Sequence, residues 1–343
     1  RTIKGITNKE AEYLKSRKIF KKTFIDFLRK LTLPEYNFIS DGDQYILTFK
    51  GNWPEVTLWE TISLSIVNRL YYRVLLKNMS KTQRQEVYTE GKKRLAEKIK
   101  ILKKNPLIKF ADFGTRRRFS RSWHEYVLTQ LISEVPGNLL GTSNVCLAMK
   151  YGIEPVGTFA HEMFMVFSGI FKDDIKGSHN KVLQYWWSEY GFDLSIALTD
   201  TYTSDFFFGD MTYEQALDWK GLRQDSGDPI EFGEKAIKFY ESHGIDPREK
   251  LIVFSDGLDI HAIQRLVSHF NGRIKMSFGW GTNLTNDLGL KALSLVTKAI
   301  ESNGEGTVKL SDNLAKAIGS QENIEYYKKI YKAEIKYNKA CVY

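Results

Sequence analysis

The chain has 343 residues, of which 42% are hydrophobic and 13% aromatic, so it is not disordered and can form two domains or one large α/β domain with an appendage. Its net charge of +9 would suit a nucleic-acid binder. The densest basic run, 92–104, however, carries apolar residues at helical spacing, which indicates a solvated helix face and favours a Lys-rich surface. No apolar stretch reaches membrane-spanning length, and Cys146 and Cys341 stand outside any CxxC pattern, so we expect a cytoplasmic protein without a disulfide framework.

The N-terminal region is predicted to be helix-rich with one hairpin. Because the chain begins with Arg1, we expect that the native start is missing. The hairpin is predicted from a strand over 45–49, a turn at Gly51-Asn52 and a second strand over 56–59. No catalytic cluster stands out in this region.

From residue 108 onward, short β-type runs alternate with amphipathic stretches of helical length. The predicted strands are 108–113, 138–142, 154–158, 195–200, 219–224, 251–256 and 274–279. The predicted helices are 123–132, 181–190, 229–240 and 258–270. This alternation favours a parallel sheet, either open or closed into a barrel. No G-x-G-x-x-G follows an early strand, so a dinucleotide-binding fold is disfavoured.

Most of these strands end in a polar cluster. The clusters are Asp112 to Arg118, Gly141 to Asn144, Gly157 to Glu162, Thr199 to Thr201, Arg223 to Asp228, Ser255 to Asp259 and Phe278 to Thr282. The carboxyl ends of parallel strands meet at one face, which is where such proteins place their active sites. The sequence therefore strongly favours an enzyme.

The richest cluster places Arg223 and Asp225 on a glycine-relaxed backbone. A guanidinium beside carboxylates suits a ligand that carries both phosphate and hydroxyl groups or Mg²⁺. Asp228 precedes Pro229, so we expect it to cap a helix rather than bind ligand.

Three other clusters carry candidate binding groups. Phe278 to Asn283 holds two glycines whose N–H groups can face one anion. Asp256 is assigned to ligand hydroxyls or Mg²⁺, whereas Asp259 is equally suited to capping a helix. Of the basic run 116–118, one or two arginines are expected to bind an anionic substrate.

His161 is the one histidine in a strand-end cluster, which favours a functional role over a structural one. Glu162 should point away from it on a helix, so we do not pair the two. No Ser-His-Asp or Cys-His arrangement is apparent, and no histidine pair has zinc spacing.

Taken in order, the clusters resemble those of the nicotinate phosphoribosyltransferases. Matching motifs are Phe113 to Ser120, Gly141 to Asn144, Gly157 to Glu162, Gly221 to Pro229, Phe254 to Asp259, Phe278 to Thr282 and Lys309 to Asp312. The resemblance implies an irregular seven-stranded α/β barrel over 108–305. It also implies a second α+β domain built from 1–107 and 306–343, usually in a homodimer.

The implied reaction joins nicotinate to phosphoribosyl pyrophosphate, with Mg²⁺, and is coupled to ATP hydrolysis. By resemblance, His161 is phosphorylated by ATP, and Arg223 and Asp225 contact phosphoribosyl pyrophosphate, Asp225 being also a candidate Mg²⁺ ligand. The other implied substrate contacts with an assigned part are Phe113 (ring wall), Arg116 or Arg118 (carboxylate), Asp256 (ribose), and Gly279, Gly281 and Thr282 (5′-phosphate). Ser143, Thr158, Thr199 and Gly257 are implied as substrate-binding residues without a specified part.

The resemblance has one gap and two near rivals. Relatives open with an Asp-x-Tyr-Lys stretch whose tyrosine reaches the neighbouring subunit, and nothing like it precedes residue 50. Nicotinamide phosphoribosyltransferases set an aspartate where this chain has Ser143, which favours a carboxylate substrate here. Quinolinate phosphoribosyltransferases need further basic contacts that the sequence does not supply.

Overall fold

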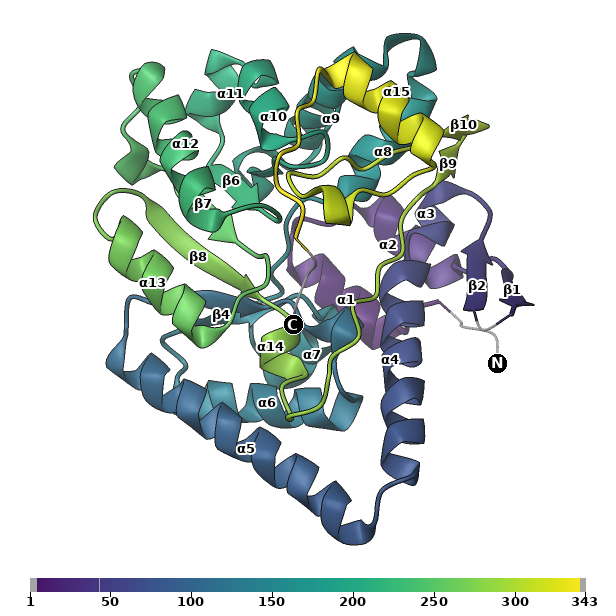
Figure 1. The fold of residues 1–343 in the computed structure, drawn as a ribbon, viewed down its shortest axis with the longest axis vertical. Helices are drawn as coiled ribbons and strands as arrows, with labels where there is room; N and C mark the ends of the chain where they lie inside the picture. The colour runs from purple at the N-terminus through teal and green to yellow at the C-terminus, as the bar shows by residue number, and fades with distance from the viewer. Residues whose placement is uncertain (1–4, 43, 340–343) are drawn as a thin grey trace.

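A six-stranded parallel sheet forms the centre of the computed structural model, which describes residues 5–42 and 44–339 (Figure 1). The strand order is β4-β3-β8-β7-β6-β5. The strands are β3 (Phe110–Asp112), β4 (Leu139–Thr142), β5 (Ile196–Leu198), β6 (Gly221–Gln224), β7 (Leu251–Phe254) and β8 (Lys275–Trp280). Each lies within one of the predicted ranges or extends it by one residue, so six of the predicted strands are confirmed.

The seventh predicted strand is wrong. Within the described residues, 154–158 makes one isolated bridge, between Pro155 and Thr142. Thr142 bonds the backbone of Glu154 and Val156 on either side of Pro155. Proline has no N–H to offer a strand on the other side of this segment, so a second neighbour cannot pair there. The predicted seven-stranded barrel is therefore a sheet of six paired strands whose edges are β4 and β5.

Helices that follow the strands pack around the sheet, as predicted. These are α6 (Arg121–Glu134), α7 (Val145–Tyr151), α8 (His161–Ile170), α9 (Ile175–Tyr190), α10 (Ser204–Asp210), α11 (Tyr213–Asp218), α12 (Pro229–Ser242), α13 (Ile260–Phe270) and α14 (Thr282–Thr285). Asp228 caps α12 by accepting from the N–H groups of Ile230 and Glu231, as expected. Asp259 caps α13 in the same way, so its capping role is the one observed.

The N-terminal region forms α1 (Asn8–Ser16), α2 (Lys22–Lys30), β1 (Tyr36–Asp41), β2 (Gln44–Phe49), α3 (Trp53–Val56), α4 (Trp59–Lys77) and α5 (Lys81–Lys104). The predicted hairpin paired the wrong strands. β2 pairs with β1 before it, whereas 56–59 belongs to helices because the chain turns into α3 at Trp53-Pro54. The basic helix is confirmed within α5, which buries Leu95, Ile99 and Leu102.

The C-terminal region passes near the carboxyl ends of the sheet strands. It contains β9 (Glu301–Ser302), β10 (Glu305–Gly306), a 3-10 turn at Leu314–Lys316 and α15 (Gln321–Tyr331). Figure 1 shows α15 in yellow beside the teal α8 and α9, and Tyr331 of α15 stacks on Tyr202 after β5. One core cluster joins side chains of α5, the sheet and α15.

The division into an N-terminal domain completed by 306–343 stays a prediction. Cys341 lies outside the described residues. No helix in the described part of the chain combines the length and the apolar character needed to cross a bilayer.

Candidate functional site

A cavity of about 700 Å³ opens at the carboxyl ends of the sheet strands, where the polar clusters were predicted to meet. Most of the predicted site residues line it. These are Phe113, Arg116, Ser143, Thr158, His161, Arg223, Asp225, Asp256, Gly257, Gly279, Gly281 and Thr282. Their convergence follows from the parallel strand direction, since each loop leaves the sheet at the same edge.

Arg223, at the end of β6, is fixed by four hydrogen bonds. Its Nε donates to Ser255 Oγ at 2.8 Å, and Nη2 donates to Asp225 Oδ1 at 2.9 Å. Nη1 donates to Thr158 Oγ1 at 2.8 Å and to the carbonyl oxygen of Phe159 at 3.2 Å. A guanidinium held by partners from three loops presents a rigid positive charge to the cavity.

His161 begins α8 and is 5% exposed. Its Nε2 lies 3.0 Å from Asp225 Oδ2, and its Nδ1 lies 3.0 Å from Thr201 Oγ1. Burial lowers the pKa of His161 to about 4, and the ammonium of Lys309 adds to the lowering. The imidazole is therefore neutral at physiological pH, with a nitrogen lone pair able to attack or to accept.

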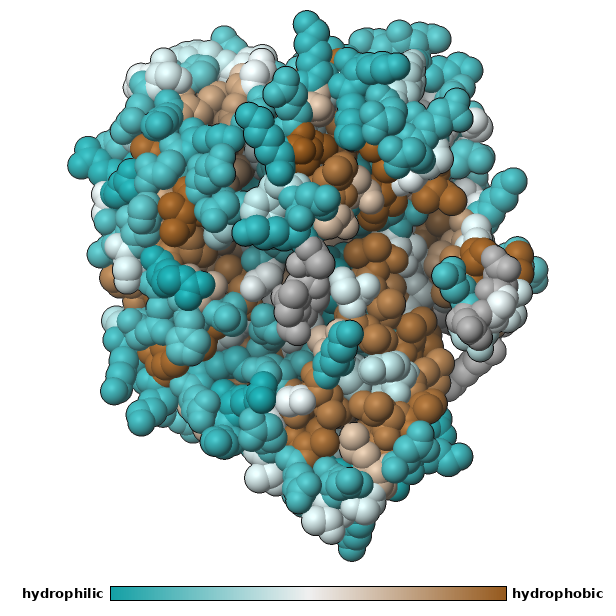
Figure 2. Space-filling view, in the orientation of Figure 1, coloured by the Kyte–Doolittle hydropathy of each residue, from teal (hydrophilic) through white to brown (hydrophobic). Residues whose placement is uncertain are grey.

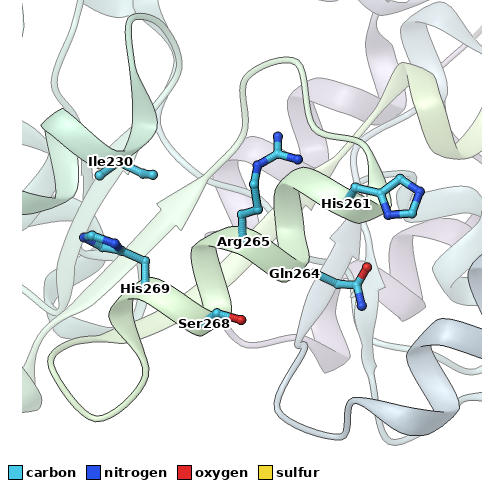
Figure 3. A pocket seen from close by; sticks show the side chains of 6 residues that line it. All are labelled: Ile230, His261, Gln264, Arg265, Ser268 and His269. Carbon is cyan, nitrogen blue, oxygen red and sulfur yellow. The ribbon is translucent and has the colours of Figure 1, made fainter.

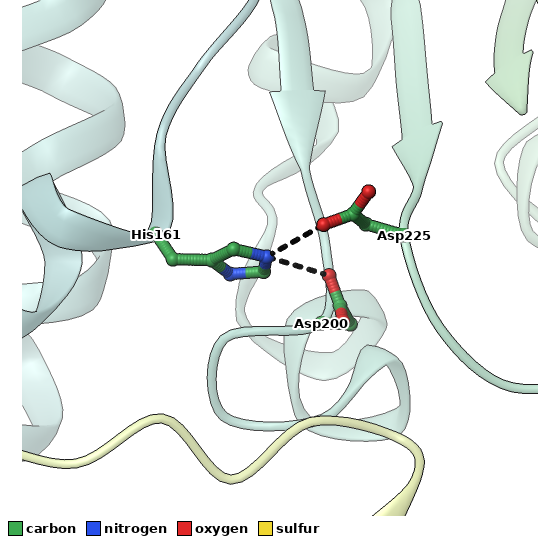
Figure 4. Close-up of side chains that lie close together, drawn as sticks. All are labelled: His161, Asp200 and Asp225. Carbon is green, nitrogen blue, oxygen red and sulfur yellow. Dashed lines mark hydrogen bonds and ion pairs between the residues drawn. The ribbon is translucent and has the colours of Figure 1, made fainter. Parts of the chain in front are cut away.

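Two carboxylates meet at His161 Nε2 (Figure 4). Besides Asp225, Asp200 Oδ1 lies 3.6 Å away, and the three side chains offer ligand atoms within 4.8 Å of one another. Burial alone would raise the pKa of Asp225, but Arg223, His161 and Lys309 hold it well below its usual range. Within the described residues, Asp200 Oδ1 is buried without a hydrogen-bond partner.

Phe113 forms an aromatic wall of the cavity because β8 carries no side chain opposite it. A Cβ on Gly279 would lie 2.5 Å from the Phe113 ring. The guanidinium carbon of Arg223 lies 5.7 Å from the ring centroid. The ring therefore has a fixed position beside the cation.

Arg116 joins a second charged cluster, at the α4 end of the cavity. Its Nη1 donates to Glu60 Oε1 at 2.7 Å, and Lys298 Nζ donates to the same oxygen at 3.3 Å. Burial raises the pKa of Glu60, but the two cations lower it further, so the net shift is downward. The cluster carries a net positive charge facing the cavity.

The C-terminal segment Lys309–Lys316 supplies two lysines to the same cavity. Lys316 Nζ donates to the carbonyl oxygen of Asp225 at 3.0 Å and to Asp256 Oδ1. Lys309 Nζ lies 3.5 Å from Asp200 Oδ2. Asp312 of this segment accepts from the N–H and the hydroxyl of Ser204, and burial raises its pKa to about 6.

A buried network beneath the cavity holds the loops after β3 and β4. Asp112 accepts hydrogen bonds from Thr142 Oγ1 and the N–H of Gly114, and its Oδ2 lies 2.6 Å from His124 Nε2. Asp112 and His124 are fully buried. The N–H of Ser143 donates to the carbonyl oxygen of Asp112, so one aspartate positions both loops.

Two predicted residues are not among the side chains that line the cavity in the described chain. Thr199 turns its hydroxyl to Ser204 Oγ at 2.9 Å and to the carbonyl oxygen of Arg223. Arg118 stands apart from Arg116 and Arg117, which both line the cavity. Glu162 Oε1 accepts a hydrogen bond from Trp53 Nε1 at 2.7 Å, and Glu162 is not paired with His161, as expected.

Sequence reasoning missed the charged partners that come from the ends of the chain. Glu60, Lys298, Lys309 and Lys316 line the cavity, and Asp200 completes the histidine cluster. Asp200 stood in a polar cluster at a predicted strand end, which was its available signal. Lys309 opens the matched motif Lys309 to Asp312, which was its signal, although no role was assigned to it. Glu60, Lys298 and Lys316 lie in helix or loop contexts where an isolated charge is ordinarily solvated.

A second depression lies on the outer side of α13 and contains none of the predicted residues. Figure 3 shows its lining, which is Ile230, His261, Gln264, Arg265, Ser268 and His269. Five of the six are solvent-exposed. His269 is also tied to Glu234 at 2.7 Å, so this depression is an ordinary surface feature.

Comparisons with known proteins agree with the motifs. Residues 108–335 match the model of the nicotinate phosphoribosyltransferase (NAPRTase) family. The structure resembles nicotinate phosphoribosyltransferase from Porphyromonas gingivalis (33% identity, TM-score 0.87, covering 96% of this chain and 85% of that one). It also resembles the Vibrio cholerae enzyme (32%, 0.88, 96% and 81%) and a putative Saccharomyces cerevisiae nicotinate phosphoribosyltransferase (27%, 0.84, 96% and 84%).

Proposed function

Because the chain belongs to the nicotinate phosphoribosyltransferase family, we propose that it joins nicotinate to phosphoribosyl pyrophosphate, giving nicotinate mononucleotide and pyrophosphate. The reaction is coupled to ATP hydrolysis through phosphorylation of His161, and it is the first step of NAD salvage from nicotinate.

The arrangement of His161, Arg223 and Asp225 carries this proposal. A neutral imidazole is the form that accepts a phosphoryl group, and burial keeps His161 neutral well below pH 7. The Asp225 carboxylate beside Nε2 and the Thr201 hydroxyl beside Nδ1 hold the imidazole ring in one orientation. Phosphorylation adds negative charge at the cavity wall beside Arg223, and we expect this charge to tighten substrate binding.

The glycosyl transfer needs charge stabilisation more than a strong base. Departure of pyrophosphate leaves a positively charged, oxocarbenium-like ribose, and Arg223 offers a fixed cation for the leaving group. Asp225 and the unsatisfied Oδ1 of Asp200 fit a divalent cation, because buried carboxylate oxygens are the ligands that Mg²⁺ prefers. When bound, Mg²⁺ supplies further charge neutralisation on the pyrophosphate.

The remaining lining residues supply the substrate contacts. Phe113 is suited to the pyridine ring, and Arg116 to its carboxylate, since one guanidinium nitrogen bonds Glu60 and others are still available. Asp256 is assigned to the ribose, and Ser143, Thr158 and Gly257 are further lining residues available to the substrates. The 5′-phosphate is assigned to Gly279, Gly281 and Thr282, whose backbone opens toward the cavity.

The activity is tested by product formation from labelled nicotinate and phosphoribosyl pyrophosphate, with and without ATP. We expect nicotinate mononucleotide to form and ATP to raise the yield. Labelled nicotinamide, run in competition, should not be converted. A chain that converts nicotinamide in preference, or neither base, would contradict the assignment.

ATP coupling is tested with His161→Asn. We expect this variant to lose ATP stimulation while it retains slow ATP-independent synthesis. The matched control is His261→Asn, an exposed histidine on α13 outside the cavity. Unchanged ATP stimulation in His161→Asn would exclude the phosphohistidine.

We also propose a homodimer. Exposed apolar side chains gather on α4 next to the cavity, as Figure 2 shows over this helix. They include Ile66, Val67, Leu70 and Val74. A large exposed apolar area is typical of an interface. Sedimentation equilibrium at micromolar concentration should give twice the monomer mass, and a monomer would contradict the proposal.

A further inference from the structure

Lys309 is a buried cation with few direct contacts. The residue is 5% exposed. Within the part of the chain that the structure describes, its ammonium contacts one carboxylate oxygen, Asp200 Oδ2, at 3.5 Å. An ammonium carries three donors, and a buried charge without close partners is costly. Because Lys309 lines the cavity, its unused donors face the place where a ligand binds.

The position of Lys309 relative to His161 is fixed by the backbone. Lys309 exchanges two hydrogen bonds with Ile318, and the N–H of Leu310 donates to the carbonyl oxygen of Thr201 at 2.8 Å. The hydroxyl of Thr201 contacts His161 Nδ1. The segment that carries Lys309 is therefore attached to the loop that holds the histidine.

One carboxylate lies between the two side chains. Asp200 Oδ1 is 3.6 Å from His161 Nε2, and Asp200 Oδ2 is 3.5 Å from Lys309 Nζ. A phosphoryl group on Nε2 would therefore enter the same charged cluster as the ammonium, whose charge already acts on the imidazole. Arg223, the other cation of the cluster, already donates to four protein acceptors, whereas Lys309 makes one longer contact to a carboxylate within the described residues.

We propose that Lys309 is a catalytic residue of the phosphoryl-transfer half-reaction and binds the phosphoryl group as it moves from ATP to His161. This inference rests on the proposed ATP coupling. An imidazole nitrogen forms the new N–P bond while the bond from the γ-phosphorus to the bridging oxygen breaks, and ADP leaves with that electron pair. The proton on the other imidazole nitrogen stays in place. Water later forms an O–P bond as the N–P bond breaks, which releases phosphate.

The ammonium acts on the charge of the transferred group. Both Asp200 and Asp225 are anionic in this cluster and would repel an incoming phosphate. Lys309 counters that repulsion and donates hydrogen bonds to the phosphoryl oxygens. Loss of one preorganised donor to a developing charge typically slows a reaction about 100-fold or more.

The test measures acid-labile phosphate on the protein after mixing with γ-labelled ATP and Mg²⁺, without nicotinate. We expect Lys309→Met and Lys309→Gln to form phosphohistidine about 100-fold more slowly than the wild type. Lys309→Arg, which keeps the charge, should recover a large part of the rate. The matched control is Lys172→Met, which removes an exposed ammonium paired with Glu305 and should label at the wild-type rate.

The outcomes separate this inference from the proposed function. Labelling of the wild type but not of His161→Asn establishes the phosphohistidine on which the comparison depends. If the wild type is not labelled, the ATP coupling itself fails and the role of Lys309 fails with it. If the wild type is labelled and a folded Lys309→Met labels equally fast, only the role of Lys309 is overturned.

A purely structural role predicts a different pattern. If Lys309 only neutralised Asp200, both neutral variants would lose ATP-independent synthesis and labelling in equal proportion, or would fail to fold. Either result overturns the proposal. Thermal unfolding of each variant identifies the second case. The proposal is supported if the rate of phosphohistidine labelling falls far more than the rate of ATP-independent synthesis.

Discussion

Gly279 is the position where one added methyl group tests the shape of the proposed base pocket. In Gly279→Ala, the new Cβ would lie 2.5 and 2.6 Å from two ring carbons of Phe113 and 3.1 Å from Ser255 Cβ. Carbon atoms in contact ordinarily lie 3.5–4.0 Å apart, so the ring has to move by about 1 Å. Because Phe113 borders the cavity, the ring moves into the space that we assign to the pyridine.

Overpacking of this kind costs about 1–3 kcal/mol. We expect most of the cost in binding, because the cavity gives the ring room to move in the free protein. The KM for nicotinate should then rise roughly 10–100-fold at saturating phosphoribosyl pyrophosphate, since each 1.4 kcal/mol is tenfold. The free energy of unfolding should fall by about 1 kcal/mol.

The assay is initial velocity against nicotinate concentration, together with urea denaturation of the same preparations. Gly209→Ala is the matched control, because Gly209 lies in α10 and a Cβ there meets nothing within 4 Å. It should leave KM unchanged and should not lower stability. A folded Gly279→Ala with the wild-type KM would refute the placement of the base against Phe113.

Three further predictions concern charge. Folding lowers the pKa of His161 from 6.5 to about 4. Between these pH values the imidazole is therefore protonated in the unfolded chain and neutral in the folded chain. Urea denaturation should therefore show the wild type losing roughly 3 kcal/mol relative to His161→Asn as pH falls from 7 to 4, and parallel pH profiles would contradict this. Glu60→Gln leaves the buried Lys298 and its neighbour Arg116 without their carboxylate, and should lower the free energy of unfolding by about 3 kcal/mol. High salt should restore part of this loss. An unchanged free energy of unfolding would exclude a stabilising role for the cluster. Asp112→Ala strips a buried acceptor from three donors and should cost about 3–5 kcal/mol in the same measurement, whereas a loss below 1 kcal/mol would show that the network is dispensable.

The regular part of the fold was readable from local patterns. Largely buried strands such as Leu251–Phe254 are continuous apolar runs bounded by turn residues. The intervening helices show apolar spacing with caps such as Asp228. The two errors have local causes that the patterns did not separate. The segment around Pro155 pairs with β4 only at Thr142, and Pro155 has no N–H for a second neighbour. The strand at 45–49 had two flanking segments with which it could pair, and the prediction chose the wrong one.

The candidate site was readable to the extent that its residues follow strands. Arg223, Asp225 and Asp256 come at strand ends, and a parallel sheet brings such ends together. His161 follows a segment that forms one bridge to the end of β4, which is enough to bring it to the same edge. Thr199 also follows a strand, but its side chain turns to Ser204. Sequence position places a backbone at the cavity and leaves the direction of each side chain undetermined.

By itself, therefore, the sequence determined which strands end in polar groups, and hence where the cavity lies and which family the chain resembles. Only the tertiary structure decided which charges face one another. Glu60 and Lys298 are 238 residues apart, and Lys309 and Asp200 more than a hundred, yet the members of each pair are in contact. Local patterns encode periodicity and capping, because these depend on neighbours in the chain. Contacts between buried charges depend on how distant segments pack, and no local pattern carries that information.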